Sequence, residues 1–404
     1  MTHVDGYGLA FTTDSAAAAE AYVEALALTL SNHIGARQQL HAALDHDPRL
    51  ALARALLAFH LQFDDDRGSA VTQILVASQH ASHATRREQQ VVHVLRRAIV
   101  GDTVIARRLI HRHLREFPRD ALMIRELVFL HAYGGASGRK ASVAAALGRL
   151  KPHMGSDPWF LGAYSLALSE IGEVELATQL ANAAIDARPD HGVAAHALAH
   201  IHFESGDNTG ARDFLDEWLT SHRRTAVNAG HLAWHLALVQ LALSDPDSAL
   251  RGYREQRTSS GVPGFRLEDA VSLLWRLQMR GVDVSDEWAD IARELPPPSP
   301  SRAFQLAHIA FAVAALGDED GLRNLAEQVE PAIRKAPQEP LRFLPPLLEA
   351  LRLVAADRWS EAAPAFAAAI AGARRLGGSN EQHVLFDETV AYARRRSGPV
   401  TAAS

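Results

Sequence analysis

Apolar residues recur along almost the whole chain at positions i, i+3, i+4 and i+7, which is the pattern of amphipathic helices. Alternating runs of β-branched residues, which would indicate strands, are nearly absent. The helices that the pattern predicts are about 12 to 18 residues long and end at Gly, Asp-Pro, Pro-Asp or Gly-Asp turns. The chain is therefore predicted to be all-α.

Small turn residues recur at a fixed interval, which indicates an internal repeat. Gly206 follows Gly172 by 34 residues, and the alanines five places after each glycine keep the same spacing. A period of 34 is that of the tetratricopeptide repeat, a unit of two antiparallel helices. Gly172 is expected to turn the chain between the helices of a unit, and Pro189 to end the second helix. The predicted fold is a tetratricopeptide-like α/α superhelix, a solenoid of antiparallel helix pairs.

The helix pairs are best defined from the middle of the chain onward. They are predicted at 157–171 with 174–187, 191–205 with 208–221, 226–243 with 246–258, 266–281 with 285–294, 301–316 with 320–334, and 339–356 with 360–375, before a last helix at 381–395. The proline-rich stretch 294–302 is a linker signal, but the pairing continues across it. We expect a single helical-repeat domain over 1–396, with a subdivision near 294–302 as the alternative, and a flexible tail at 397–404.

Composition narrows the classes of function. The 404 residues are 48% hydrophobic and 22% charged, as in folded soluble proteins, and the absence of cysteine excludes disulfides and zinc–thiolate sites. The formal net charge of −6 speaks against a nucleic-acid partner, because phosphate binding needs a basic face. The N-terminal stretch lacks the features of a signal peptide, and no apolar run is long enough to cross a bilayer. A cytoplasmic protein without a membrane partner is expected.

One segment, ATRREQQVVHVLRRA at 84–98, is locally basic. Its arginines alternate with apolar residues at helical spacing, and this predicts a solvated helix face. The arginines concerned are Arg86, Arg87, Arg96 and Arg97.

Two histidine pairs carry the candidate chemistry. His196 and His200 lie in the stretch HALAH, and a second pair, His231 and His235, lies in HLAWH. The members of each pair are one helical turn apart and project from one face. The second pair follows the first by 35 residues, within one residue of the repeat length. We therefore expect both pairs at similar height on neighbouring first helices, which line the concave side of such an array, and His308 on a further first helix.

Imidazole is a ligand for Zn, Fe, Ni and Cu, and HxxxH on a helix presents two such ligands together. The four paired histidines are therefore candidate metal ligands, and with His308 they are candidate catalytic residues. Histidine beside a carboxylate such as Asp269 or Glu170 can transfer protons near neutral pH. The alternative for all five is a buried imidazole that fills the inner helix layer.

Several stretches, in order along the chain, resemble the tetratricopeptide repeat protein 38 family: DPWFLGAYSLALSEIGEVELATQLANAAIDARPDHGVAAHALAHIHFESGD, HLAWHLAL with SALRGY, LEDAVSLLWRLQMRG, AHIAFAVAALGD and LGGSNEQHVLFDETV. The resemblance covers nearly the whole chain from about residue 14. It implies an α/α superhelix with a polar pocket on its inner side, but no particular reaction. Beyond the histidines, its motif matches include Trp234, Asp269, Trp275, Gly378 and Gln382.

Two positions depart from the family pattern. Asn380 stands where the family usually has a histidine after GGS, and the acidic residue after HALAH is displaced by one place, as Glu204. The candidates for substrate binding are Trp234, Asp269, Trp275, Gln382, Asn380 and Glu170.

Two functions fit these patterns. In the first, a histidine-rich pocket on the concave face binds a small polar molecule and catalyses acid–base or metal-assisted chemistry, such as hydrolysis or isomerisation, with Zn, Fe, Ni or Cu as candidate cofactor. The alternative is a non-catalytic adaptor that binds a peptide or partner protein in the groove.

Carboxylate clamps of adaptors need Lys, Arg and Asn side chains, whereas the first helices predicted between 157 and 243 carry no Lys or Arg. No nucleotide-binding, hydrolase-elbow or HExxH motif is found. The pocket hypothesis is therefore preferred.

Overall fold

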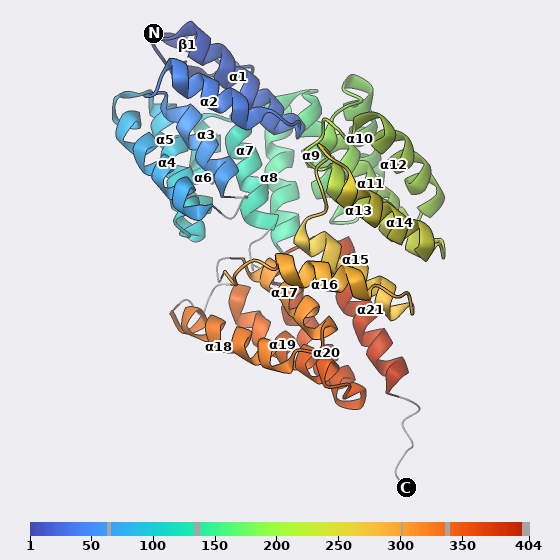
Figure 1. Ribbon diagram of the computed structural model, residues 1–404. Helices are drawn as coiled ribbons and strands as arrows, with labels where there is room; N and C mark the ends of the chain where they lie inside the picture. Colours follow the sequence, from blue (N-terminus) through green and yellow to red (C-terminus); the bar gives the residue numbers. More distant parts are fainter. Residues whose placement is uncertain (63–65, 133–137, 300–301, 336–339, 398–404) are drawn as a thin grey trace. The chain divides into compact units, whose positions relative to one another are not determined.

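The computed structural model describes residues 1–62, 66–132, 138–299, 302–335 and 340–397. These residues form 21 α-helices, two short 3-10 helices and one two-stranded hairpin, so the predicted all-α fold of tetratricopeptide-like helix pairs is confirmed (Figure 1). The tail predicted at 397–404 lies, apart from Ser397, outside the described residues. Within the described ranges, no helix has both the length and the apolar character to span a membrane.

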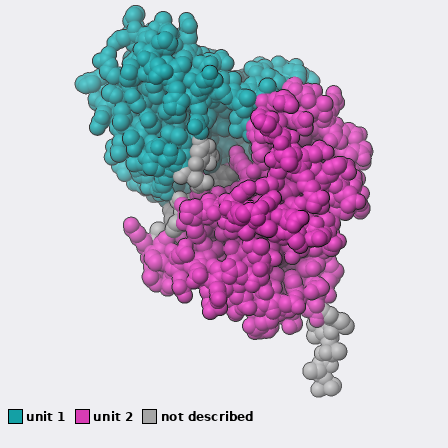
Figure 2. Space-filling view, in the orientation of Figure 1, with its two compact units in different colours: residues 1–131, 140–201, 225–227 teal, residues 132–139, 202–224, 228–404 magenta. Residues whose placement is uncertain are grey.

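The chain separates into two compact units, drawn teal and magenta in Figure 2. Unit 1 comprises Met1–His131, Lys140–Ile201 and Thr225–Val227, and unit 2 comprises Ala132–Arg139, His202–Arg224 and Asn228–Ser404. Each unit has its own core of buried aliphatic and aromatic side chains. The expectation of a single domain over 1–396 stays a prediction.

The elements of unit 1 follow one another as β1 (Thr2–Val4), β2 (Ala10–Thr12), α1 (Ala16–Ser31), α2 (Ala36–His46), α3 (Ala51–Leu61), α4 (Arg67–His80), η1 (Ala81–His83), α5 (Arg86–Ile99), α6 (Thr103–Glu116), α7 (Ala121–Ala132), α8 (Arg139–Met154), α9 (Pro158–Ser169), α10 (Val174–Ala187) and most of α11 (Gly192–Ser205). Helices adjacent in sequence pack as antiparallel pairs, for example α1 with α2, α3 with α4, and α9 with α10.

The elements of unit 2 are α12 (Asn208–His222), α13 (Ala229–Ala242), α14 (Pro246–Thr258), α15 (Leu267–Met279), α16 (Ser285–Glu294), α17 (Ala303–Ala315), α18 (Glu319–Lys335), η2 (Pro340–Phe343), α19 (Leu344–Ala355), α20 (Trp359–Ala373) and α21 (Asn380–Arg396). From α9 onward every predicted helix is present, with ends within a few residues of the prediction, except that η2 precedes α19.

The repeat signals act as the sequence analysis expects. Gly172 and Gly206, in the turns that follow α9 and α11, have φ of +84° and +72°, a left-handed backbone that favours glycine. Between α9 and α10, the Ser165 hydroxyl donates a hydrogen bond of 2.7 Å to the carbonyl of Ala177. A β-carbon on Gly162 of α9 would lie 3.0 Å from the backbone of Ala194 in α11. Small residues therefore set the close approach of the inner helices of unit 1.

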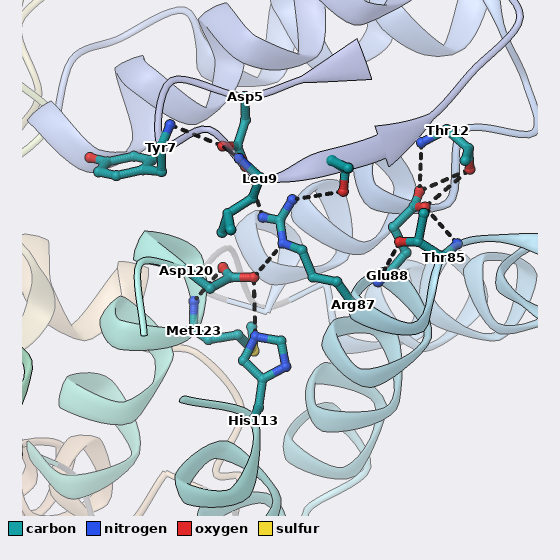
Figure 3. A network of polar contacts seen from close by, with 11 residues as sticks. Asp5, Tyr7, Leu9, Thr12, Thr85, Arg87, Glu88, His113, Asp120 and Met123 are labelled. Atoms are coloured by element: carbon teal, nitrogen blue, oxygen red, sulfur yellow. Dashed lines mark hydrogen bonds and ion pairs between the residues drawn. The ribbon is translucent and has the colours of Figure 1, made fainter. Parts of the chain in front are cut away.

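The N-terminal hairpin is an element that the sequence analysis does not predict. Its strands pair antiparallel with Thr2 opposite Thr12, and the hairpin is anchored to the helices by the polar network in Figure 3. Arg87 of α5 binds Asp5 at 2.9 Å and Asp120 at 2.7 Å, and His113 Nε2 lies 3.1 Å from Asp120.

The prediction that the arginines of 84–98 form a solvated face is therefore wrong for Arg87, whose side chain is 4% exposed. Arg86 and Arg96 are exposed as predicted, and Arg97 is half-buried. Arg87 points inward because two buried carboxylates compensate its charge.

Candidate functional site

The first histidine pair lies on α11, in unit 1. The Nε2 atoms of His196 and His200 are 3.1 Å apart, and the rings meet edge to face with centroids 4.6 Å apart. His200 is buried and His196 is half-buried. The one-turn spacing predicted from the sequence thus brings the two Nε2 atoms together.

A carboxylate holds the other side of this pair. Nδ1 of His200 lies 3.2 Å from Glu170, the residue that follows α9, and the second oxygen of Glu170 lies 2.5 Å from Lys140 Nζ. Burial alone would raise the pKa of Glu170, but the contact with His200 and the charge of Lys140 outweigh it and lower the pKa to about 2. Glu170 is therefore an anion beside the imidazole.

The second pair, on α13 in unit 2, repeats the arrangement. The Nε2 atoms of His231 and His235 are 3.2 Å apart, with ring centroids 4.7 Å apart. Nδ1 of His231 donates to Asp269 at 2.9 Å, and Nδ1 of His235 lies 2.6 Å from Glu381. Asp269, Glu381 and His235 are almost completely buried.

The backbone explains how these carboxylates reach the second pair. Gly230 precedes His231, and a β-carbon at Gly230 would lie 1.9 Å from the carbonyl oxygen of Gly264. The missing side chain lets the segment before α15 pass directly over α13, and Asp269 follows in the first turn of α15. Glu381 lies in the first turn of α21. Both anions therefore sit at helix N-termini, where the helix dipole stabilises negative charge.

The pKa of Asp269, like that of Glu170, is set by burial and by a histidine partner, which act in opposite directions. Burial acts to raise the pKa of Asp269, but the hydrogen bond and charge of His231 reverse this and lower it. An ionised Asp269 fixes the proton of His231 on Nδ1 and leaves Nε2 as the side of the ring that can bind a cation.

Trp234 packs directly on the second pair. Its ring stacks on His231 with an interplanar angle of 16° and a centroid distance of 5.2 Å, and it meets His235 edge to face at 4.9 Å. The side chain is fully buried, and its Nε1–H has no hydrogen-bond partner among the described residues. An unpaired buried donor of this kind costs about 1–3 kcal/mol unless something accepts its hydrogen bond.

Two further candidates, His308 and Trp275, are fixed in the interior of unit 2. His308 is buried, and its Nδ1 donates to the carbonyl of Phe304 at 2.9 Å. Burial lowers the pKa of His308 to about 4, so the ring is neutral at pH 7. Trp275 donates to Thr389 at 3.0 Å and packs edge to face on Phe311.

The candidates at the start of α21 have local partners. The side-chain oxygen of Gln382 accepts from the backbone N–H of Ser379 at 3.1 Å and completes a capping box. Asn380 Nδ2 donates to Glu204 at 2.6 Å. The two positions that depart from the family pattern are therefore bonded to each other.

Two residues of the site, Glu381 and Lys140, are not among those predicted from the sequence. Glu381 lies between the candidates Asn380 and Gln382, yet successive residues of a helix point in different directions. The sequence could indicate Glu381 only if the face of α21 that packs against His235 were known, and this depends on how α21 packs. Lys140, one of only three lysines, precedes its partner Glu170 by 30 residues without a shared motif.

No family model matches the chain. Among solved structures, it is similar to a chain in the structure of Naa15/Naa10 bound to HypK-THB, with 12% identity over 94% of this chain and 61% of that chain and a TM-score of 0.26. It is also similar to the TPR domain of P58(IPK), with 13% identity over 95% of this chain and 100% of that chain and a TM-score of 0.22. The chain thus spans about three fifths of the first of these chains. Both TM-scores are low, and nothing about ligands or partners follows from them.

Proposed function

We propose that this helical-repeat protein binds one divalent transition-metal ion through His196, His200, His231 and His235, and that it acts on a small polar molecule by acid–base or metal-assisted chemistry. The observation that carries the proposal is a repeated arrangement. In each pair the Nε2 atoms face each other, and carboxylates hold Nδ1 of three of the four rings.

The donor set fits a transition metal. Two nitrogens bound to one metal at about 2.0–2.1 Å lie about 3.3 Å apart in a tetrahedral site and about 2.9 Å apart as neighbours in an octahedral one. The separations of 3.1 and 3.2 Å within the pairs lie between these two values. Imidazole suits Zn, Cu, Fe and Ni, whereas Mg and Ca prefer oxygen. Metal-binding histidines almost always donate their other ring N–H to a carboxylate or carbonyl, which is the role of Glu170, Asp269 and Glu381.

The repeat supports a single ion for both pairs. The 35-residue offset gives the pairs the same position in consecutive repeat units, and four is the number of ligands that a closed tetrahedral site requires. Zn bound to four imidazoles would fill that site and be structural. Fe, Ni or Cu, with five or six ligands, would keep a position for water or substrate, so metal-assisted catalysis at four histidines would require one of these ions.

Trp234 supports a small-molecule ligand beside the second pair. Its buried N–H has no acceptor among the described residues, and an oxygen of a bound molecule would satisfy it. In the adaptor alternative a peptide carboxylate would need basic groove residues, which the first helices of 157–243 lack. We further propose kinship with the tetratricopeptide repeat protein 38 family, on the motifs that surround these residues.

Elemental analysis of untagged protein, purified without chelator, tests the metal. We expect about one equivalent of one transition metal per chain, and loss of it in His200→Ala. The exposed His153 provides the matched control, because His153→Ala should keep the metal. Two equivalents would mean that each pair binds its own ion. Absence of metal, also after incubation with Zn, Ni, Cu and Fe(II) salts, would refute metal binding.

A further inference from the structure

A basic stripe on α6, in unit 1, lies outside the histidine site. Residues 103–115 contain four arginines and no Asp or Glu, in a protein whose net charge is −6. Arg108, Arg112 and Arg115 are exposed and spaced i, i+4 and i+7, so they share one face over about 10 Å of helix. Among the described residues, none of the three forms an ion pair.

The stability of α6 does not explain why these three arginines share one face. Like charges at i, i+4 destabilise a helix by a few tenths of a kcal/mol per pair. The helix dipole favours a cation in the last turn and so explains Arg115, but Arg108 lies in the first half of α6. Glu116, at the end of the helix, is already bound by Arg86 at 2.7 Å and Gln90 at 3.0 Å.

The positive charge extends to a neighbouring helix. Burial lowers the pKa of His111, and the charges of Arg149 on α8 and Arg115 lower it further. Arg149 is also exposed. The positive charge around His111 therefore comes from basic side chains of two helices, α6 and α8.

Apolar side chains adjoin the stripe at its N-terminal end. Val104 and Ile105 are 47% and 38% exposed, and they precede Arg108 by four and three residues, which places them on the same side of α6. The surface therefore offers an aliphatic contact followed by three cations. Phe, Tyr and Trp, on whose rings nucleic-acid bases commonly stack, are absent from 103–115.

We propose that this face of α6 binds an acidic peptide segment of a partner protein, with aliphatic side chains on Val104 and Ile105 and carboxylates on Arg108, Arg112 and Arg115. Arginine pairs with carboxylates in a bidentate way. A peptide of about five extended residues covers the length from Val104 to Arg115.

The test is fluorescence anisotropy with a labelled peptide of two leucines followed by six glutamates, at low and at physiological salt. We expect saturable binding that weakens at least tenfold in the triple variant R108A/R112A/R115A and two- to fivefold in V104S/I105S. The matched control removes three exposed arginines of unit 2 through R251A/R323A/R334A, and it should change the affinity less than twofold.

Circular dichroism should show that all variants keep their helix content. Absence of peptide binding, equal losses in both arginine variants, or tighter binding of a single-stranded oligonucleotide with six phosphates would each overturn the proposal. The last result would identify the stripe as a nucleic-acid surface instead.

Discussion

Glu126 of α7 is a carboxyl group buried without compensation. Its side chain is completely buried, and neither carboxyl oxygen has a hydrogen-bond partner among the described residues. Burial raises the pKa of Glu126 to about 8, although the charge of the neighbouring Arg125 acts to lower it. The folded protein therefore holds this group protonated at neutral pH, while the unfolded chain releases the proton above its ordinary pKa of 4.5.

The sign and size of the effect follow from proton linkage. Between pH 4.5 and 8 the folded state binds one proton more than the unfolded state, so the free energy of unfolding falls as pH rises, by about 1.4 kcal/mol per pH unit. From pH 5.0 to 7.5 this amounts to about 3 kcal/mol. Glu126→Gln has no such contribution. The difference in stability, variant minus wild type, should therefore increase by about 3 kcal/mol over this interval.

Urea titrations of both proteins at pH 5.0 and 7.5 measure this double difference, with hydrogen exchange of α7 peptides as the readout local to Glu126. A constant cost or gain from burying an amide cancels, because it is the same at both pH values. Groups elsewhere that titrate in both proteins cancel in the same way. A double difference below about 1 kcal/mol would refute the assignment of a protonated Glu126.

Three further predictions concern packing and the carboxylates. Arg87→Met removes the cation that Asp5 and Asp120 share, and of these two buried carboxylates only Asp120 keeps a side-chain partner among the described residues, His113. The stability of unit 1 should fall by about 3–5 kcal/mol in urea titrations, whereas Arg86→Met, at an exposed position, should change it by less than about 1 kcal/mol. Gly230→Ala pushes a β-carbon into a backbone carbonyl and should destabilise unit 2 by at least about 1–3 kcal/mol in thermal melts. The control Gly252→Ala, with open space in α14, should stabilise it by up to about 1 kcal/mol. Equal effects of the two substitutions would contradict the close approach of Gly230 to the backbone of Gly264. Glu381→Gln should weaken metal binding about 10–100-fold in chelator competition. An unchanged affinity would show that Glu381 does not contribute to metal binding.

The helix pairs could be predicted from the sequence because their signals are local. Gly172 and Gly206 mark turns by their backbone freedom, and Pro189 stands two residues after the last residue of α10. The hairpin could not be predicted in this way, since its strands of three residues are too short to show alternation. Its stability depends on the buried pair of Asp5 and Arg87, which are 82 positions apart.

The histidine pairs could be predicted for the same reason, because residues four apart on a helix share a face in any fold. Their carboxylates could be predicted only in part. Asp269 and Glu170 can be predicted from the sequence as carboxylate partners of the histidines, but which imidazole ring each one contacts depends on packing between helices. Glu381 contacts His235 across 146 positions of sequence, and only the placement of α21 against α13 brings them together.

X-ray absorption at the metal edge tests the central claim most directly, because it counts the imidazoles bound to one ion. The proposal predicts about four nitrogen ligands at about 2.0–2.1 Å, with the outer-shell scattering of imidazole, and a first-shell change in each of His196→Ala, His200→Ala, His231→Ala and His235→Ala. A shell composed mainly of oxygen, two imidazoles per ion, or spectra unchanged in these variants would contradict it.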